Sequence, residues 1–383
     1  MTPSTPSSSV TPPEALLPYG VRIEMGAGAD PQAVEAEARA LLASLSSEDC
    51  TDILHEAGGV LRLALSADAT ARWAPGLDTT GLVDALGLDT HAREADLDRE
   101  ILLALLLAPV PLAYPSVAEL ASAIRIRRYT VQAARKTALA FDTEAAERPE
   151  DCWTYSEATG FVLRPGADLI DALRKATQPD ATGKLYAFSC YRATEYVTLL
   201  GIAQELQDTN PPLYGRLQRQ WEQRAIMSGL FHDVFLREYG SLQDPLPSRY
   251  YVPGDRLWFR NPDEASANAE GYEGSWVVYV GEGRYTNFWK RDQPFTLVSK
   301  CLEIYHWRDA TYENDRGQLR VDDDEVDRRV HQTQQDPRAV QAILARMLRI
   351  RDPQGVYAEG GCIDATRECA RWVRPGSADL ALP

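Results

Sequence analysis

The feature that most constrains the fold is a long amphipathic stretch, Arg192 to Leu206, which starts just after the apolar run Tyr186-Ala187-Phe188-Ser189-Cys190. Its apolar residues recur at helical spacing, which predicts a helix with one face in a hydrophobic core. They are Ala193, Val197, Leu200 and Ala203. Cys190 then lies where a helix begins, and unpaired backbone amides and the helix dipole stabilise a thiolate there. The sequence therefore predicts a candidate cysteine nucleophile. The alternative is a buried structural thiol.

The composition is that of a globular protein with few signs of a nucleic-acid or membrane partner. The 383 residues are 44% hydrophobic and 25% charged, and the formal net charge of -16 argues against binding to a polyanion. The longest apolar run, Ile101 to Ala108, is too short to span a bilayer. The Ser/Thr/Pro-rich start, Met1 to Pro13, lacks the pattern of a Sec signal peptide. These features predict a protein made in the cytoplasm, and a signal-independent secretion route stays open.

No pattern in the sequence predicts a metal site or a disulfide framework. The six cysteines are far apart with no C-x-x-C spacing, and the five histidines are equally scattered. The acidic run Asp322 to Glu325 lacks the spacing and central glycine of an EF-hand loop. We therefore expect reduced thiols and no bound metal.

Composition and periodicity divide the chain into four segments. Residues 1–18 cannot bury enough apolar surface to offset the entropy of ordering, which predicts a disordered tail. Residues 19–108 alternate strand and helix signals, as an accessory α/β region would. Residues 109–312 should form the core and residues 313–383 a C-terminal helical extension. Inside the core we expect a helix from Leu213 to about Glu238 and then strands at Arg256–Phe259 and Ser275–Val280.

Several motifs between about Pro109 and Asp309 resemble, in order, those of the bacterial spore-coat type of protein-glutamine gamma-glutamyltransferase. Pro115 to Leu120 is similar to the family's Ser-Ile-Ala-Glu-Leu helix, and Trp153 to Leu163 resembles its Tyr-Trp-Arg-Val-Ser-Pro strand region. Tyr186 to Cys190 resembles Tyr-Ala-Phe-Glu-Cys, where the cysteine is the nucleophile. Gly254 to Pro262 resembles Gly-Asp-Cys-Leu-Tyr-Phe-Lys-Asn-Pro, and Tyr272 to Ser275 falls where the family has Trp-Arg-Gly-Glu. The resemblance implies an α+β fold with a papain-like (NlpC/P60-like) core.

The departures from the family pattern lie at the residues that assist the cysteine. Ser189 stands where the family has a glutamate before the nucleophile, and Ser275 stands in place of a second catalytic glutamate. A family histidine falls near Phe288. A thiol near its ordinary pKa is mostly protonated at neutral pH and needs a base or cation to activate it. Two substitutes are open: Glu273, two residues before Ser275, and His306 after the strands. The favoured interpretation of Glu273 is a solvated loop residue, and that of His306 and His232 is histidines with structural partners on a helix face.

The resemblance implies transglutaminase-like acyl transfer from a protein glutamine to a lysine amine or water through a Cys190 thioester. Glu273, Ser275 and Ser189 would assist Cys190, and this chemistry needs no cofactor. Residues that would bind the protein substrate are Tyr272, Trp258, Trp276 and Asp255. The alternative for the aromatic residues is packing within the strands. The alternatives are a catalytically impaired pseudoenzyme that binds or assembles with other proteins, and a cysteine deamidase or hydrolase that acts on a foreign protein. Association with a spore or surface assembly is also implied, whereas substrate identity and oligomeric state stay open.

Overall fold

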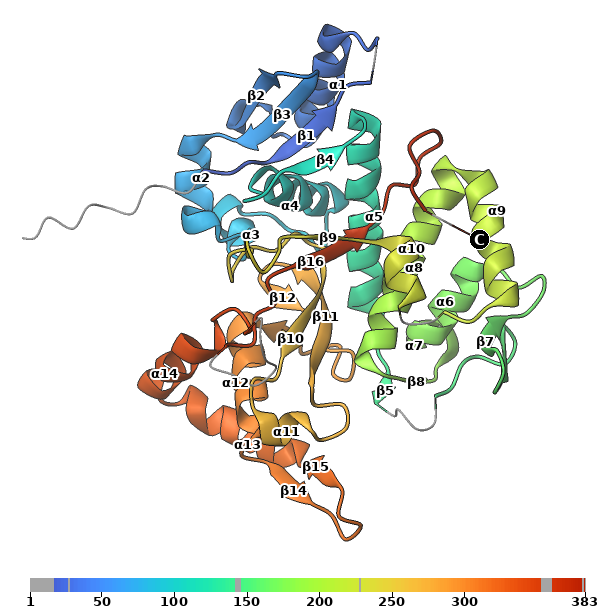
Figure 1. The fold of residues 1–383 in the computed structure, drawn as a ribbon, viewed down its shortest axis with the longest axis vertical. Coiled ribbons are helices and arrows are strands. Elements are labelled where there is room, and N and C mark those ends of the chain that lie inside the picture. Colours follow the sequence, from blue (N-terminus) through green and yellow to red (C-terminus); the bar gives the residue numbers. More distant parts are fainter. Residues whose placement is uncertain are drawn as a thin grey trace, which may run out of the picture.

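A computed structural model describes residues 17–26, 28–141, 146–226, 229–352, 360–380 and 382. Helices and strands are mixed along the chain, so the fold is of the α and β type (Figure 1). The tail expected over residues 1–18 lies outside the described residues as far as residue 16. Among the helices that the structure describes, none is long and apolar enough to cross a membrane.

A four-stranded sheet in the order β2-β3-β1-β4 forms the first part of the chain, at the top of Figure 1. The strand β1 is antiparallel to β3 and parallel to β4. The strands are β1 (Val21–Glu24), β2 (Thr51–Glu56), β3 (Val60–Leu65) and β4 (Leu112–Tyr114). The accompanying helices are α1 (Pro31–Ser44), α2 (Ala67–Trp73), α3 (Leu82–Leu86) and α4 (Glu94–Leu106). Asp30 caps α1 with Pro31 at its first position, the arrangement that favours a helix start.

Two long helices, α5 (Val117–Lys136) and α8 (Cys190–Thr209), pack against each other through the middle of the molecule (Figure 1). Their contact is close because Gly201 has no side chain: a Cβ there would lie 2.3 Å from Thr130 Oγ1. Arg125 and Ser122 of α5 also bind the buried Glu205 of α8. Nearby helices are α6 (Leu169–Thr177), α7 (Pro179–Thr182), α9 (Pro211–Gln223) and α10 (Leu230–Phe235). Two small two-stranded sheets complete this part: β5 (Ala140–Phe141) with β8 (Ala187–Phe188), and β6 (Trp153–Ser156) with β7 (Gly160–Leu163).

The central sheet has six strands in the order β13-β12-β11-β10-β16-β9. They are β9 (Leu236–Tyr239), β10 (Arg256–Arg260), β11 (Gly274–Gly281), β12 (Arg284–Tyr285), β13 (Phe295–Thr296) and β16 (Arg367–Ala370). β10 and β11 are antiparallel with Trp258 opposite Trp276, and α8 packs against β11. This packing places the N-terminus of α8 beside the middle of the sheet.

A helical cluster at the bottom of Figure 1 combines a short helix from the connection between β10 and β11 with the elements that follow β13. Its elements are α11 (Glu264–Ala267), α12 (Leu297–Trp307), β14 (Thr311–Glu313), β15 (Leu319–Val321), α13 (Asp323–Gln334) and α14 (Pro337–Met347). The acidic run near Asp322 begins a helix: Asp322 caps α13, and three acidic residues occupy its first turn, where the helix dipole favours negative charge. The cluster therefore supplies two helices, α12 and α13, next to the central sheet.

Two sequence predictions need comment. The single helix expected from Leu213 to Glu238 is wrong, because α9 ends at Gln223 and residues 236–239 form the strand β9. The division of the chain at residues 108 and 312 stays a proposal. Either boundary would place neighbouring strands of one sheet in different segments. β4 pairs with β1, and β16 lies between β10 and β9.

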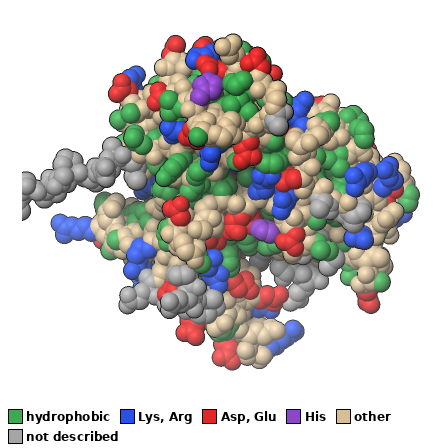
Figure 2. Space-filling model, turned by 45° about the horizontal axis from the view of Figure 1, so that its top comes forward, with side chains coloured by type: hydrophobic (Ala, Val, Ile, Leu, Met, Phe, Trp, Pro, Cys, Tyr) green, Lys and Arg blue, Asp and Glu red, His purple; other side chains and the backbone are tan. Residues whose placement is uncertain are grey.

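On the face drawn in Figure 2, basic side chains are distributed among acidic ones and do not form one continuous patch.

Candidate functional site

Cys190 is the first residue of α8, as its position in the sequence predicts. Ser189 is the N-cap: its side-chain oxygen accepts a hydrogen bond from the Arg192 amide at 3.3 Å. Ser189 therefore fixes where the helix begins, which is the usual role of a serine at this position. The backbone N–H groups of Trp276 and Tyr191 act on the Cys190 thiol and lower its pKa. The thiol thus lies between a helix N-terminus and the strand β11.

Cys190 opens onto a cavity of about 490 Å³, which we call the Cys190 cavity. Strand β11 and the residues just before it form one wall, the segment between β12 and α12 forms a second, and helices α12 and α13 form the third. Its lining residues include Tyr272, Ser275, Trp276, Phe288, Lys290, Phe295, Lys300, Glu303, Trp307, Asp323, Asp327 and His331. The volume is within the range of small-molecule binding sites, about 300–1,000 Å³.

The environment of Cys190 does not favour a thiolate at neutral pH. Burial raises the pKa of the Cys190 thiol above its ordinary value, because a low-dielectric surrounding disfavours the charged form. The Trp276 amide, the positive charge of Lys300, the Tyr191 amide and the charge of Arg256 act in the opposite direction on this pKa without reversing it. The thiol is therefore mostly protonated at pH 7.

This raised pKa predicts an alkaline profile for the reactivity of Cys190. Because only the thiolate reacts, the alkylation rate should rise about tenfold per pH unit from pH 7 to 9. The measurement is the rate of iodoacetamide labelling at Cys190, followed by peptide mass spectrometry. A rate that levels off below pH 8 would contradict the prediction.

Of the proposed helpers, Ser275 lines the Cys190 cavity and Glu273 does not. Ser275 lies on β11 opposite Phe259 of β10. The side chain of Glu273 is exposed, and its backbone oxygen accepts a hydrogen bond from the Asn261 amide. Phe288, at the position of the family histidine, also lines the cavity. A serine and a phenylalanine thus line the cavity at the positions where the resemblance expects ionisable residues.

Two of the proposed substrate-binding aromatics line the cavity, and a third supports it. Trp276 stacks on Trp258 with ring centroids 5.5 Å apart and planes at 1°, so Trp258 lies behind the cavity wall. A Cβ at Gly274 would lie 2.1 Å from Trp258 Nε1, so glycine permits this stack. Tyr272 lines the cavity and donates its hydroxyl to Asp323 Oδ1 of α13 at 2.9 Å.

A buried cation supports the other face of Trp276. The Arg256 guanidinium carbon lies 3.9 Å from the centroid of the Trp276 ring and 4.5 Å from that of Tyr191. Arg256 forms an ion pair with Glu368 of β16 and donates to Thr194 Oγ1 of α8 at 2.8 Å. These contacts join α8, β10, β11 and β16 directly beneath the cavity.

Asp255, the fourth proposed substrate-binding residue, is fully buried away from the cavity lining. Arg127 Nη1 lies 2.8 Å from its Oδ1, and the Tyr239 hydroxyl and the Val252 amide donate to its Oδ2. Its surroundings are those of a core ion pair between α5 and the residue just before β10.

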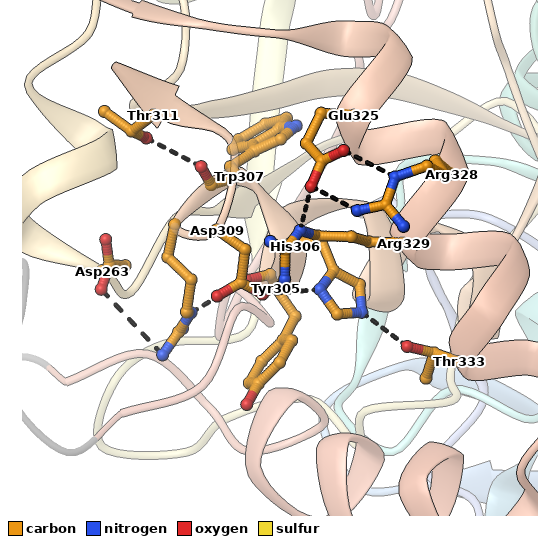
Figure 3. Close-up of polar contacts among 11 residues, drawn as sticks. Asp263, Tyr305, His306, Trp307, Asp309, Thr311, Glu325, Arg328, Arg329 and Thr333 are labelled. Carbon is orange, nitrogen blue, oxygen red and sulfur yellow. Dashed lines mark hydrogen bonds and ion pairs between the residues drawn. The ribbon is translucent and has the colours of Figure 1, made fainter. Parts of the chain in front are cut away.

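Both histidines considered as substitute bases have partners outside the cavity. The ring nitrogens of His306 lie 2.7 Å from Asp309 Oδ2 and 2.8 Å from Thr333 Oγ1, so His306 connects the end of α12 to α13 (Figure 3). Asp309 also approaches Arg329 of α13, whose guanidinium binds Glu325 (Figure 3). His232 Nδ1 lies 2.9 Å from Glu368 Oε1. Neither histidine lines the Cys190 cavity.

Sequence reasoning missed the charged residues that α12 and α13 bring to the cavity. Lys300 is 2% exposed, and its ammonium lies 2.8 Å from Glu303 Oε2. Lys290 and Asp327 form a second pair across the cavity at 2.7 Å. A signal for Lys300 was present: it shares the inward stripe of α12 with Leu297, Cys301 and Ile304, where a cation is unusual.

Comparison with known proteins places the chain in a family. No curated protein matches its sequence. Among solved structures, it is similar to a transglutaminase from Geobacillus stearothermophilus without its C-terminal extension. The identity is 21%, the match covers 55% of this chain and 96% of that chain, and the TM-score is 0.39. The family model described as protein-glutamine gamma-glutamyltransferase matches residues 83–382. The chain therefore belongs to the protein-glutamine gamma-glutamyltransferase family.

Proposed function

We propose that this protein transfers the acyl group of a protein glutamine to an amine through a thioester on Cys190. Family membership supports glutamine acyl transfer in general. The observation that carries the assignment to Cys190 is its position at the start of α8, open to the Cys190 cavity. The packing of α8 against β11 agrees with a papain-like core, in which a helix presents the thiol beside a sheet.

The proposed reaction has two halves. The Cys190 thiolate attacks the carboxamide carbon of the glutamine, and the C–N bond then breaks to release ammonia and leave a thioester. A lysine amine next attacks the thioester carbon, the C–S bond breaks, and an isopeptide bond remains. If water takes the place of the amine, the product is glutamate. Neither half needs a metal or an organic cofactor.

Each proposed site residue has a role that agrees with its location. Trp276 and Tyr272 would form the walls along which the glutamine side chain enters, and Trp258 would hold Trp276 in place. Ser275 would offer a hydroxyl beside the thiol, and Ser189 would fix the first turn of α8. The exposure of Glu273 and the burial of Asp255 favour roles outside the acyl transfer itself.

The second candidate function is a pseudoenzyme that retains the fold for binding or assembly. It is favoured by Ser189, Ser275 and Phe288 at the family's three ionisable positions, and by the raised pKa of Cys190. A deamidase that uses water as the only acceptor is the remaining alternative.

One assay separates the three functions. The purified protein would be incubated with a glutamine-containing protein and a fluorescent primary amine between pH 7 and 10, and both ammonia release and amine incorporation would be followed. We expect both signals, and both should increase with pH. Ammonia without amine incorporation identifies a deamidase. Absence of both signals over the whole pH range, with several substrate proteins, would contradict the enzymatic proposal and leave the pseudoenzyme.

A further inference from the structure

The most unusual residue lining the Cys190 cavity is the buried lysine Lys300. Lys300 faces inward on α12 at 2% exposure, and its ammonium lies 2.8 Å from Glu303 Oε2 and 3.4 Å from the centroid of the Phe295 ring. Burying a cation has a large desolvation cost, and an apolar residue on the same stripe of α12 would avoid it. Such a residue calls for a functional explanation.

Lys300 is also the cation best placed to act on Cys190. Both line the same cavity, and the positive charge of Lys300 lowers the pKa of the thiol more than that of Arg256 does. The guanidinium of Arg256 lies behind Trp276 and is engaged by Glu368 and Thr194. Lys290 also lines the cavity, but its side chain is about half exposed and is paired with Asp327.

The remaining titratable groups of the cavity have other partners. Asp323 accepts the Tyr272 hydroxyl, Asp327 binds Lys290, and exposed His331 approaches Gln335. Glu303 faces the cavity and holds the Lys300 ammonium. Among the described lining residues, Lys300 is thus the buried proton donor that shares the cavity with the thiol.

We propose that Lys300 is the acid–base partner of Cys190, in place of the glutamates and histidine that the family pattern has at Ser189, Ser275 and Phe288. This inference rests on the proposed function of Cys190. Glu303 is a positioning residue that holds the Lys300 ammonium at the cavity.

Lys300 can donate and accept the protons that both halves of the proposed reaction require. The thiol loses its proton to water, and the thiolate is held beside the ammonium. When the thiolate has attacked the glutamine carbon, Lys300 donates a proton to the leaving nitrogen, so ammonia departs and Lys300 becomes a neutral amine. The neutral amine then takes a proton from the attacking amine or water as the C–S bond breaks, which restores thiolate and ammonium.

Two substitutions of Lys300 separate its charge from its proton transfer. Lys300→Met removes both, so Cys190 alkylation at pH 8 should fall about tenfold and its pH midpoint should rise by about one unit. Lys300→Arg keeps a permanent cation, so alkylation should stay within about threefold of wild type. Ammonia release by this variant should nevertheless fall about 100-fold, because a guanidinium does not exchange its proton at these pH values.

A third variant tests the same idea with the opposite sign. Glu303→Gln removes the negative charge that offsets Lys300, so Cys190 alkylation at pH 8 should increase a few-fold. Unfolding would instead also increase the labelling of the other buried cysteines, Cys50, Cys152, Cys301 and Cys362. Lys136→Met, an exposed lysine at the end of α5, serves as the control for lysine removal. Circular dichroism would verify that each variant is folded.

Alkylation of Cys190 tests whether Lys300 acts on the thiol, and ammonia release tests whether Lys300 transfers protons. If Lys300→Met and Glu303→Gln both leave the pH profile of Cys190 alkylation unchanged, Lys300 is not coupled to the thiol and the inference is wrong. Full ammonia release by Lys300→Arg would overturn its role in proton transfer. If wild type releases no ammonia, the proposed function fails, while the alkylation profiles still decide whether Lys300 acts on Cys190.

Discussion

Replacing Cys190 by serine is expected to lower ammonia release from a glutamine substrate by at least about 10³-fold. A serine hydroxyl has a far higher pKa than a thiol, so beside the Lys300 ammonium it would supply far less of the anionic nucleophile than Cys190 does. Serine is tolerated at the start of a helix, so α8 and its Ser189 cap should persist. The measurement is the initial rate of ammonia release at the pH optimum of the wild-type protein.

The matched control is Cys50→Ser. Cys50 is buried in the N-terminal part of the chain, and its sulfur donates to the Ser47 backbone oxygen, which a hydroxyl can also do. Its rate should remain within about twofold of wild type. A Cys190→Ser variant as fast as this control would refute the thioester mechanism.

Removing Arg127 should produce the largest loss of stability among the ion pairs described above. Arg127 and Asp255 are 4% and 0% exposed, so Arg127→Met would leave a buried carboxylate with no opposite charge. Breaking a buried pair in this way costs about 3–5 kcal/mol. Urea unfolding followed by circular dichroism would measure it, with Lys184→Met as control. The exposed pair between Lys184 and Glu147 should contribute less than about 1 kcal/mol. Equal losses in the two variants would contradict the prediction.

Asp255→Asn distinguishes a core residue from a substrate-binding residue. If Asp255 acts through the core, the variant should be destabilised and its KM should stay near the wild-type value. If it binds substrate, KM should rise while the unfolding midpoint changes little. Both quantities can be measured on one preparation.

Elements with local signals could be predicted from the sequence, whereas those fixed by distant contacts could not. The starts of α5 and α8 follow from the caps Ser116 and Ser189 and from an apolar stripe. The strand β16 has no such signal, because its identity depends on pairing with β9 and β10. In the described helix α13 only Val326 is buried, so its sequence resembles a solvated charge run.

The residues of the candidate site that lie in the recognised motifs could be predicted from the sequence. Those that later helices contribute to the cavity could not. Ser275 and Trp276 line the same cavity as Cys190 because β11 packs against α8. Glu273 was expected to share the face of Ser275, but β11 begins at Gly274, so the alternation of a strand does not extend to it. The inward stripe of α12 marks Lys300 as buried, but only the tertiary packing of α12 brings it to the Cys190 cavity.

The ion pair between Arg256 and Glu368 joins residues 112 positions apart, and it lies at the place where β16 fills the gap between β10 and β9. Closing a chain segment of this length is slow compared with forming a helix, so the edge of β10 should stay unpaired until late in folding. Exposed strand edges promote aggregation. This strand carries Arg256, whose guanidinium packs on the ring of Trp276. A shortened chain that ends before Arg367 would therefore keep Cys190 and the whole lining of its cavity, yet lack the strand that completes the sheet beneath them.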